Sequence, residues 1–264
     1  FFEAFANIYT EFADSIKKRS KKSKLETVHP TVHDGVMGIK FIFAAKKSSN
    51  LNSKWIKIWY YNLILNTWSD LRFRMINFTL LGAGRIGKMH AKIIFDHPDA
   101  NLVNVYDVNQ EFASQVASDY DANIAKSPMD AVNDENTDAV LIASATPTHT
   151  EYLIMTSEAN KPVLCEKPID LDINKVNDCR DKIAGSSNLI QIGFNRRFDK
   201  SHASLKQAYN NGEIGKLEKL IITSRDPSPP GLDYLNAAGG FFRDTTIHDF
   251  DLSRFILGDD PIIE

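Results

Sequence analysis

A glycine turn between a short apolar run and an amphipathic helix pattern limits the possible folds of this chain more than any other feature. The turn Gly82-Ala83-Gly84-Arg85-Ile86-Gly87 follows the apolar run at 76–81. An acid, Asp107, ends the next strand-like run, 20 residues beyond Gly87. In this order the glycines permit a tight turn, close approach of a ligand to the backbone, and close packing of helix on strand. The segment therefore predicts a βαβ unit with a ligand site at the start of its helix.

Strand and helix signals continue to alternate after this turn. Strand-like runs are found at 102–108, 138–145, 161–167 and 189–195, and helical patterns at 110–120, 148–160 and 174–185. Continuous apolar strands that alternate with helices indicate a parallel sheet covered on both faces. We therefore predict an α/β fold, a Rossmann-type doubly wound parallel sheet, over residues 75–196.

The pattern loosens from residue 197 onward. A helix is predicted at 201–211, a strand at 216–225, and a further helix within Gly239-Gly240-Phe241-Phe242-Arg243-Asp244-Thr245-Thr246-Ile247-His248-Asp249-Phe250-Asp251-Leu252-Ser253-Arg254-Phe255. One strand and two helices cannot bury a sheet face. We therefore interpret 197–264 as the start of an incomplete α+β substrate domain.

Composition narrows the class of protein. The hydrophobic and charged fractions of the 264 residues, 43% and 25%, are those of a soluble globular protein. No apolar run approaches the length of a membrane span, and the first residues lack a signal-peptide pattern. Two cysteines, Cys165 and Cys179, give neither a disulfide framework nor a metal-ligand spacing. We expect a cytoplasmic protein without a membrane partner.

Residues 1–74 differ from the remainder. They carry 13 Lys+Arg against 6 Asp+Glu, but the basic residues cluster at 17–24, where a solvated helix end explains them better than a nucleic-acid arm. Phe1, Phe5, Ile8, Phe12 and Ile16 share one helical face, which predicts an amphipathic helix over 1–16. Residues 59–74 have no period and are interpreted as a linker or translated spacer.

The glycine turn and Asp107 together favour NAD as the ligand. Phosphates would lie on the unpaired N–H groups at the positive end of the helix, beside Gly82, Gly84, Arg85, Ile86 and Gly87. Asp107 can accept hydrogen bonds from the ribose hydroxyls, and its charge would repel the 2′-phosphate of NADP. A structural βαβ unit without a ligand is the less favoured alternative.

Two further segments lie where ligands bind in such folds, at the carboxyl ends of strands. Thr146-Pro147-Thr148-His149 follows the run at 138–145, and Glu166-Lys167-Pro168 ends the run at 161–167. Proline restricts the residue before it to an extended or turning backbone, so Lys167 should project from the sheet edge. For an isolated lysine, a solvated surface position would be the better explanation.

Five segments in order resemble the motifs of one family. GAGRIGKMHA, ATPTHTEYL, CEKPID, GFNRRFD and GGFFRDTTIHDFDLSRF are similar to those of the glucose–fructose oxidoreductase / inositol dehydrogenase (Gfo/Idh/MocA) family, from Met75 to the C-terminus. Within it, SRDPSPP and DTTIHDFD are most similar to inositol 2-dehydrogenases. The resemblance implies NAD-dependent oxidation of a cyclitol ring hydroxyl, with myo-inositol giving its 2-keto product. Another sugar or polyol dehydrogenase, or a non-catalytic NAD- or sugar-binding fragment, remains an alternative.

The resemblance also assigns roles to residues. Lys167, Asp244 and His248 would be catalytic: His248 as general base, Asp244 as its support, Lys167 as the group that stabilises the alkoxide. Positions i and i+4 share a helix face, so Asp244 and His248 can address one substrate. Further cofactor contacts would come from Ser144, Thr146, Pro147, His149 and Glu166. The polyol would contact Asn195, Arg196, Asp226 and Tyr234.

Other polar residues near this segment have plainer explanations. Asp249 and Asp251 favour the positive end of a helix, and Asp251 could pair with Arg254 or Arg243. A metal site from Asp244, His248 and Asp251 is the less favoured interpretation, and we expect no metal. His90, His149 and His202 are interpreted as structural or cofactor-adjacent.

Residues 1–58 resemble the C-terminal end of another member of the same family, with its last two helices and final strand. Our hypothesis is that the chain joins the tail of one oxidoreductase to the head of a second, and that the tail docks on the dinucleotide-binding domain. A homo-oligomer of the family type is possible, although the assembly sheet of the family is absent from this sequence.

Overall fold

The computed structural model describes residues 7–9, 12, 75–225 and 238–260. Its centre is one parallel sheet of six strands in the order β3-β2-β1-β4-β5-β6. The strands are β1 (Ile76–Leu81), β2 (Ala100–Tyr106), β3 (Asn123–Ile124), β4 (Ala139–Ile142), β5 (Val163–Cys165) and β6 (Ile190–Ile192). The strand order reverses between β1 and β4, as in doubly wound dinucleotide-binding folds. The predicted fold class is confirmed.

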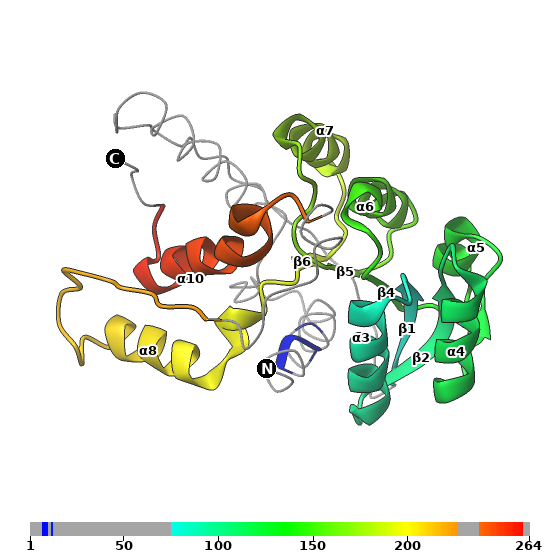
Figure 1. The fold of residues 1–264 in the computed structure, drawn as a ribbon, viewed down its shortest axis with the longest axis horizontal. Coiled ribbons are helices and arrows are strands. Elements are labelled where there is room, and N and C mark those ends of the chain that lie inside the picture. Colours follow the sequence, from blue (N-terminus) through cyan, green and yellow to red (C-terminus); the bar gives the residue numbers. More distant parts are fainter. Residues whose placement is uncertain (1–6, 10–11, 13–74, 226–237, 261–264) are drawn as a thin grey trace.

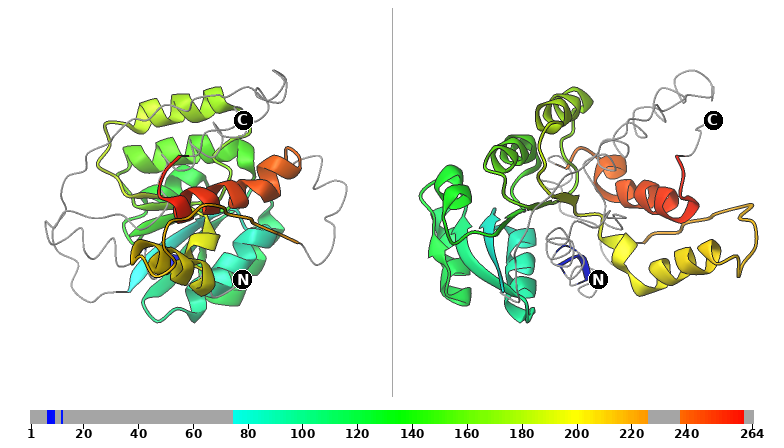
Figure 2. Two further views of the ribbon diagram at one scale, coloured as in Figure 1. Left: turned by 90° about the vertical axis from the view of Figure 1, so that its left-hand side faces the viewer. Right: turned by 180° about the vertical axis from the view of Figure 1, so that it is seen from behind.

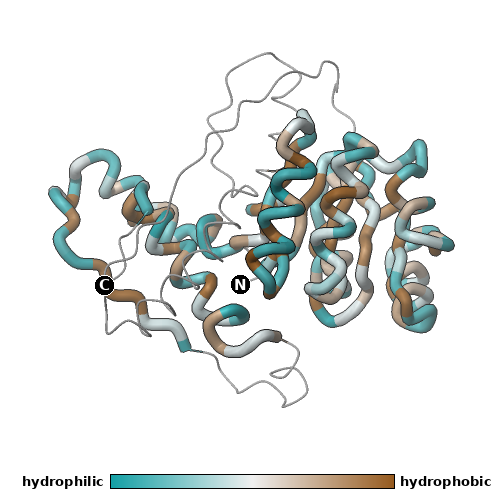
Figure 3. The backbone as a smooth tube through the Cα atoms, turned by 90° about the horizontal axis from the view of Figure 1, so that it is seen from above, coloured by the Kyte–Doolittle hydropathy of each residue, from teal (hydrophilic) through white to brown (hydrophobic). Residues whose placement is uncertain are grey.

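Helices cover both faces of this sheet (Figure 1). They are α3 (Arg85–Asp96), α4 (Gln110–Tyr120), α5 (Pro128–Asn133), α6 (His149–Glu158) and α7 (Ile173–Ile183). Two separate buried clusters form, one with α3 and α4 and one with α5, α6 and α7. Hydrophobic and hydrophilic stretches alternate along these helices (Figure 3), because each buries one side only.

The sequence pattern located most of these elements within a few residues. The helix predicted at 110–120 and the strand at 76–81 match α4 and β1. The pattern missed β3 and α5, which are too short to show a period. It also extended the strand at 138–145 beyond β4, because Ala143 to Ala145 are apolar or small but already belong to the turn.

Three described residues near the N-terminus complete the first cluster. Ile8, Tyr9 and Phe12 are at most 1% exposed and belong to the same cluster as Phe78 of β1. The Asn7 side chain donates a hydrogen bond of 2.8 Å to the carbonyl of Phe198. Figures 1 and 2 show this segment in blue, between α3 and the start of α8 (Lys200–Asn210). These contacts agree with the docking hypothesis, while the predicted domain boundaries and the resemblance of 1–58 stay predictions.

Beyond the sheet the chain forms a short turn, two helices and an extended connection. The turn η2 (Asn195–Phe198) leads into α8, and α10 (Ile247–Leu257) packs against α8. The strand predicted at 216–225 is wrong: these residues run past α10 without pairing (Figure 1). A strand needs a neighbour for its backbone groups, and the described residues contain one sheet, which does not reach this segment.

No helix in the described part of the chain is long and apolar enough to cross a membrane.

Candidate active site

The glycine turn has the geometry that its spacing predicted. Gly82 adopts φ +103°, and a Cβ atom there would collide with the backbone nitrogen of Ser144. A Cβ on Gly87 would collide with the carbonyl oxygen of Gly82. Glycine is therefore required at both positions, the first for the turn and the second for the approach of α3 to β1.

Gly84 lies in open space at the start of α3. A Cβ atom there would meet nothing within 4 Å, and Gly84 caps α3 without a side-chain hydrogen bond. The first turn of α3 also carries no acidic residue. An open, positively polarised helix end with uncapped N–H groups fits a phosphate group.

Asp107 is fixed beside this turn. Its Oδ2 accepts a hydrogen bond of 2.6 Å from the N–H of Ala83, and its Oδ1 accepts one of 2.7 Å from the N–H of Asn109. A carboxylate can accept about four hydrogen bonds. The remaining lone pairs can therefore still accept from a pair of hydroxyl groups.

His149 links the end of β4 to the segment that carries Lys167. Its Nε2 lies 3.0 Å from the carbonyl oxygen of Ser144, and its Nδ1 lies 2.8 Å from that of Pro168. Burial lowers the pKa of His149, although both carbonyl oxygens act against this shift. Nearby, the Ser144 and Thr148 hydroxyl groups are 2.6 Å apart, and Thr146 and Pro147 form the turn η1 (Thr146–Thr148). His149 thus holds two loops together at the carboxyl edge of the sheet.

Lys167 and Asp244 come together at this edge. The Lys167 ammonium group donates hydrogen bonds of 2.7 Å to the Asp244 carbonyl oxygen and 3.1 Å to its Oδ1. The Lys167 and Asp244 side chains are 14% and 18% exposed, so the ion pair is mostly shielded from water. Lys167 therefore does not have the solvated position that an isolated surface lysine would take.

Asp244 lies in an unusual helical turn. The segment η3 (Phe242–Thr246) is a π-helix that leads directly into α10. Gly239 and Gly240, at φ +76° and +89°, turn the backbone into it. Wide π-helical turns are rare and occur frequently at functional sites.

His248 follows in the first turn of α10 and faces two cations. Burial lowers the pKa of His248 well below its usual value, and the positive charges of Lys167 and Arg196 lower it further. Its ring packs edge-on against Phe194, with centroids 6.4 Å apart, and its buried Nδ1 finds no hydrogen-bond partner among the described residues. The imidazole is therefore neutral at neutral pH and can accept a proton.

Arg196 is anchored beside His248. Its guanidinium group donates a 2.8 Å hydrogen bond to the Ser224 hydroxyl and also binds the Asp249 carboxylate. Asn195 is 5% exposed, and its buried Oδ1 has no hydrogen-bond partner within the part of the chain that the structure describes. Asp226 and Tyr234, predicted to contact the substrate, lie outside the described residues.

Comparison with known proteins identifies the family. Residues 76–194 match the family described as "Oxidoreductase family, NAD-binding Rossmann fold", and residues 202–262 match the "GFO/IDH/MocA C-terminal domain". The chain belongs to the GFO/IDH/MocA family. The resemblance of its sequence motifs is thereby confirmed.

Three relatives illustrate this similarity. The chain is 43% identical over 188 residues to inositol 2-dehydrogenase of Rhizobium meliloti, covering 71% of this chain and 56% of that one. It is 42% identical over 182 residues to myo-inositol 2-dehydrogenase of Thermotoga maritima, covering 69% and 54%. The structure of scyllo-inositol dehydrogenase from Lactobacillus casei with bound NAD(H) and scyllo-inositol matches with a TM-score of 0.62 and 32% identity, covering 70% and 57%. The chain spans about half the length of these relatives.

In this GFO/IDH/MocA protein, Asp251 and Arg254 have ion-pair partners that the sequence did not point to. Asp251 pairs with Arg197 on η2, and Arg254 binds Asp260 through a hydrogen bond of 2.5 Å. The sequence favoured Arg254 or Arg243 as partner of Asp251 because they are near in the chain. Residues 197 and 251 meet only because α10 folds back over η2.

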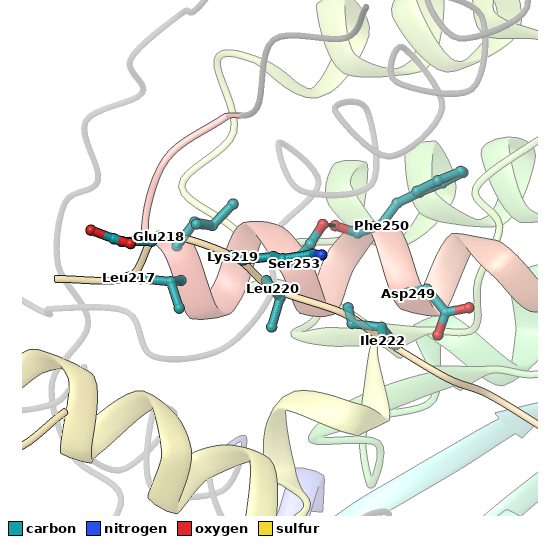
Figure 4. Close-up of a pocket in the computed structure, with 9 residues that line it drawn as sticks. Leu217, Glu218, Lys219, Leu220, Ile222, Asp249, Phe250 and Ser253 are labelled. Carbon is teal, nitrogen blue, oxygen red and sulfur yellow. Dashed lines mark hydrogen bonds between the residues drawn. The ribbon is translucent and has the colours of Figure 1, made fainter. Parts of the chain in front are cut away.

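Two cavities flank the extended segment 217–225. One, of about 410 Å³, lies between this segment and α10; Figure 4 shows Leu217, Leu220 and Ile222 beside Asp249, Phe250 and Ser253. The other, of about 510 Å³, has Asn195 and Arg196 in its wall. Lys167, Asp244 and His248 line neither cavity.

Glu166 lies behind Lys167 and is 8% exposed. Its Oε1 binds His90 Nε2 at 2.7 Å, and its Oε2 accepts a 3.2 Å hydrogen bond from the Lys167 N–H. Sequence reasoning expected Glu166 to contact the cofactor and did not connect it to His90, 76 residues away. The buried histidine within α3 was the available signal. Among the described residues no cluster of three metal-ligating side chains occurs.

Proposed function

We propose that this chain carries the NAD site and the catalytic groups of a dehydrogenase that oxidises a ring hydroxyl of a cyclitol, with myo-inositol as the substrate and its 2-keto derivative as product. The observation that carries the proposal is the hydrogen-bonded pair of Lys167 and Asp244 at the carboxyl edge of the sheet, with the Lys167 charge acting on a neutral His248. Ligands bind at this edge in doubly wound folds.

The residues of the glycine turn fit NAD. The uncapped start of α3 would hold the pyrophosphate near Gly84, where no Cβ occupies the space. Asp107 would accept hydrogen bonds from the adenosine ribose, and its charge would exclude a 2′-phosphate. Arg85, Ile86, Ser144, Thr146 and Pro147 would line the same cradle. When bound, NAD supplies the acceptor for the hydride that leaves the substrate carbon.

The catalytic groups would divide the proton chemistry. His248 would take the hydroxyl proton of the substrate, because its lowered pKa keeps the ring neutral at neutral pH. The Lys167 ammonium group uses two of its three N–H donors on Asp244. The third would donate to the substrate oxygen as its negative charge develops. Asp244 would fix the direction of that donor, and Asn195 and Arg196 would contact the polyol.

The names of the relatives support a cyclitol as the proposed substrate. The relatives at 43% and 42% identity are named inositol 2-dehydrogenase and myo-inositol 2-dehydrogenase, and the Lactobacillus casei structure holds scyllo-inositol. A cyclitol presents several hydroxyl groups that can each donate and accept hydrogen bonds, which suits a site of charged and amide groups such as Arg196 and Asn195. Another polyol or sugar is the second candidate within the same chemistry.

The test is NADH formation by the full chain with myo-inositol, scyllo-inositol and a panel of hexoses. We expect NADH with a cyclitol, a higher rate with NAD than with NADP, and loss of the rate in Lys167→Met. NAD binding without NADH formation from any polyol would favour the non-catalytic alternative and overturn the proposal.

A further inference from the structure

A buried chain of hydrogen bonds runs from the N-terminal segment to the backbone of Lys167. The Tyr9 hydroxyl lies 2.6 Å from His90 Nδ1, and His90 Nε2 lies 2.7 Å from Glu166 Oε1. The second carboxylate oxygen of Glu166 accepts the Lys167 N–H at 3.2 Å. The side chains therefore link residues 9, 90 and 166 in one continuous path.

Burial makes each hydrogen bond of this path hard to replace. Tyr9 and His90 are each 1% exposed and Glu166 is 8% exposed, so water cannot replace a lost partner easily. A buried polar group that loses its partner carries the full cost of desolvation. Each member of the path therefore fixes the position of the next.

The direction of the hydrogen bonds follows from chemistry. The pKa of Glu166 is lowered: burial opposes this shift, while the hydrogen bond from His90 and the positive charge of Lys167 favour it. An ionised carboxylate only accepts hydrogen bonds, so His90 Nε2 must donate its N–H. Burial raises the pKa of Tyr9 well above its usual value, so its hydroxyl keeps its proton and donates it to Nδ1. His90 is thereby held as the Nε2–H tautomer.

The surroundings leave the Glu166 carboxylate little freedom. A Cβ atom on Gly193 would lie 3.2 Å from the carboxylate carbon and from Oε2, so only glycine leaves ordinary contact distance there. On the other side of the path, the Tyr9 ring packs edge-on against Phe78 with centroids 5.6 Å apart. The carboxylate is thus held between β6, α3 and the backbone of the segment that carries the catalytic lysine.

We infer that Tyr9, His90 and Glu166 act as positioning residues for Lys167, through which the N-terminal segment sets the orientation of the lysine toward Asp244. The inference depends on the proposed function only for the chemical role of Lys167. According to this inference, the Tyr9 hydroxyl affects turnover although Tyr9 is far from Lys167 in sequence. Packing of the Tyr9 ring alone would not produce this effect.

The variant that isolates this effect is Tyr9→Phe, which removes the hydroxyl and keeps the ring against Phe78. Its matched control is Tyr152→Phe, a buried tyrosine on the opposite face of the sheet. Two readouts do not need turnover: the ¹⁵N shift of His90 Nδ1, identified with His90→Gln, and the hydrogen-exchange rate of the Lys167 amide relative to the β5 amide of Leu164. The third is kcat with myo-inositol, measured beside the KM for NAD.

We expect Tyr9→Phe to shift Nδ1 toward an unbonded nitrogen and to speed exchange at Lys167 more than at Leu164. We also expect kcat to fall about threefold to tenfold, as for the loss of one hydrogen bond, with the KM for NAD unchanged. Tyr152→Phe should change none of these. Glu166→Gln should reproduce the Lys167 exchange effect with the Tyr9 hydroxyl intact.

An unmoved Nδ1 signal, or exchange at Lys167 that changes only in step with Leu164, would overturn the inference. A wild-type kcat in Tyr9→Phe would overturn it as well. If the wild-type chain forms no NADH from any cyclitol, the proposed function fails, and the ¹⁵N and exchange readouts still decide the positioning path.

Discussion

The Lys167 ammonium nitrogen lies 2.7 Å from the backbone carbonyl oxygen of Asp244, although 77 residues separate the two in sequence. The same nitrogen is 3.1 Å from the Asp244 carboxylate. One end of this pair follows β5, and the other lies in the π-helical turn before α10. The pair therefore links the π-helical turn before α10 to the carboxyl edge of the parallel sheet.

Replacing Lys167 by methionine tests the role of its charge. Lys167→Met keeps the length of the side chain and removes the three donors, so we expect kcat to fall about 10²- to 10³-fold, as for the loss of an oxyanion donor. NAD affinity should stay within about threefold, because the glycine turn is untouched. Steady-state rates and NAD titration measure both. Lys175→Met on the exposed side of α7 is the control, and an equal loss there would contradict the assignment.

Gly84 tests the cofactor cradle without disturbing the fold. A Cβ at Gly84 meets nothing within 4 Å, so Gly84→Ala should change the free energy of unfolding by less than about 1 kcal/mol. The added methyl group would lie where the pyrophosphate approaches the backbone, so NAD affinity should fall about tenfold or more. Calorimetric titration and urea unfolding measure the two effects. Gly185→Ala, also in open space, should change neither.

The sequence predicted the parts of this fold that depend on short-range patterns. The glycine turn, β1 and α4 follow from glycine spacing and apolar periodicity, which are local properties. The segment 216–225 shows the limit of that reasoning. Its apolar content is typical of a strand, but a strand forms only when a neighbour accepts its backbone hydrogen bonds, and no local signal reports the neighbour.

The candidate site likewise contains residues that local motifs predicted and long-range contacts that they could not predict. Family motifs predicted Lys167, Asp244 and His248 as site residues. In the structure Lys167 forms an ion pair with Asp244, and the positive charge of Lys167 helps to lower the pKa of His248. The path through His90 to Glu166 could not be predicted, because residues 76 positions apart carry no sign of their contact. Arg197 and Asp251 were missed for the same reason.

Asp107 should decide the choice between NAD and NADP. The N–H groups of Ala83 and Asn109 fix its carboxylate beside the glycine turn. Asp107→Asn keeps the shape and removes the charge that repels a 2′-phosphate, so the preference for NAD over NADP should fall about tenfold or more. The ratio of kcat/KM for the two cofactors measures it. Asp119→Asn, exposed on α4, is the control. An unchanged ratio in Asp107→Asn would contradict the role.

His248 should make stability and activity depend on pH in a defined direction. Its pKa in the folded chain lies well below about 6.5, the value expected when unfolded, so the unfolded state binds protons first as the pH falls. Stability is therefore greatest above about pH 6.5 and is lost as the pH falls from there through the folded pKa. In the folded chain the imidazole stays neutral until the pH approaches this lowered pKa, so kcat/KM should persist to a lower pH than for a solvated imidazole.

His248→Gln isolates this contribution. Urea unfolding between about pH 7.5 and pH 5 should show a smaller loss of stability in the variant than in the wild-type chain. A residual slope is expected from His149, whose pKa burial also lowers. Identical slopes in the two proteins would show that His248 does not titrate as the structure implies.

The described N-terminal residues should contribute to the stability of the sheet domain. Phe12 is fully buried, and its ring lies 6.3 Å from that of Phe78 on β1, so Phe12→Ala would leave a cavity in the first cluster. Truncation of a buried phenylalanine costs about 3–5 kcal/mol in the free energy of unfolding. Phe95→Ala is the matched control, because Phe95 on α3 is 63% exposed and its loss should cost about 1 kcal/mol or less. Urea unfolding followed by fluorescence measures both. Equal costs would mean that the N-terminal segment does not pack on the sheet in solution, and the path from Tyr9 to Lys167 would lose its first member.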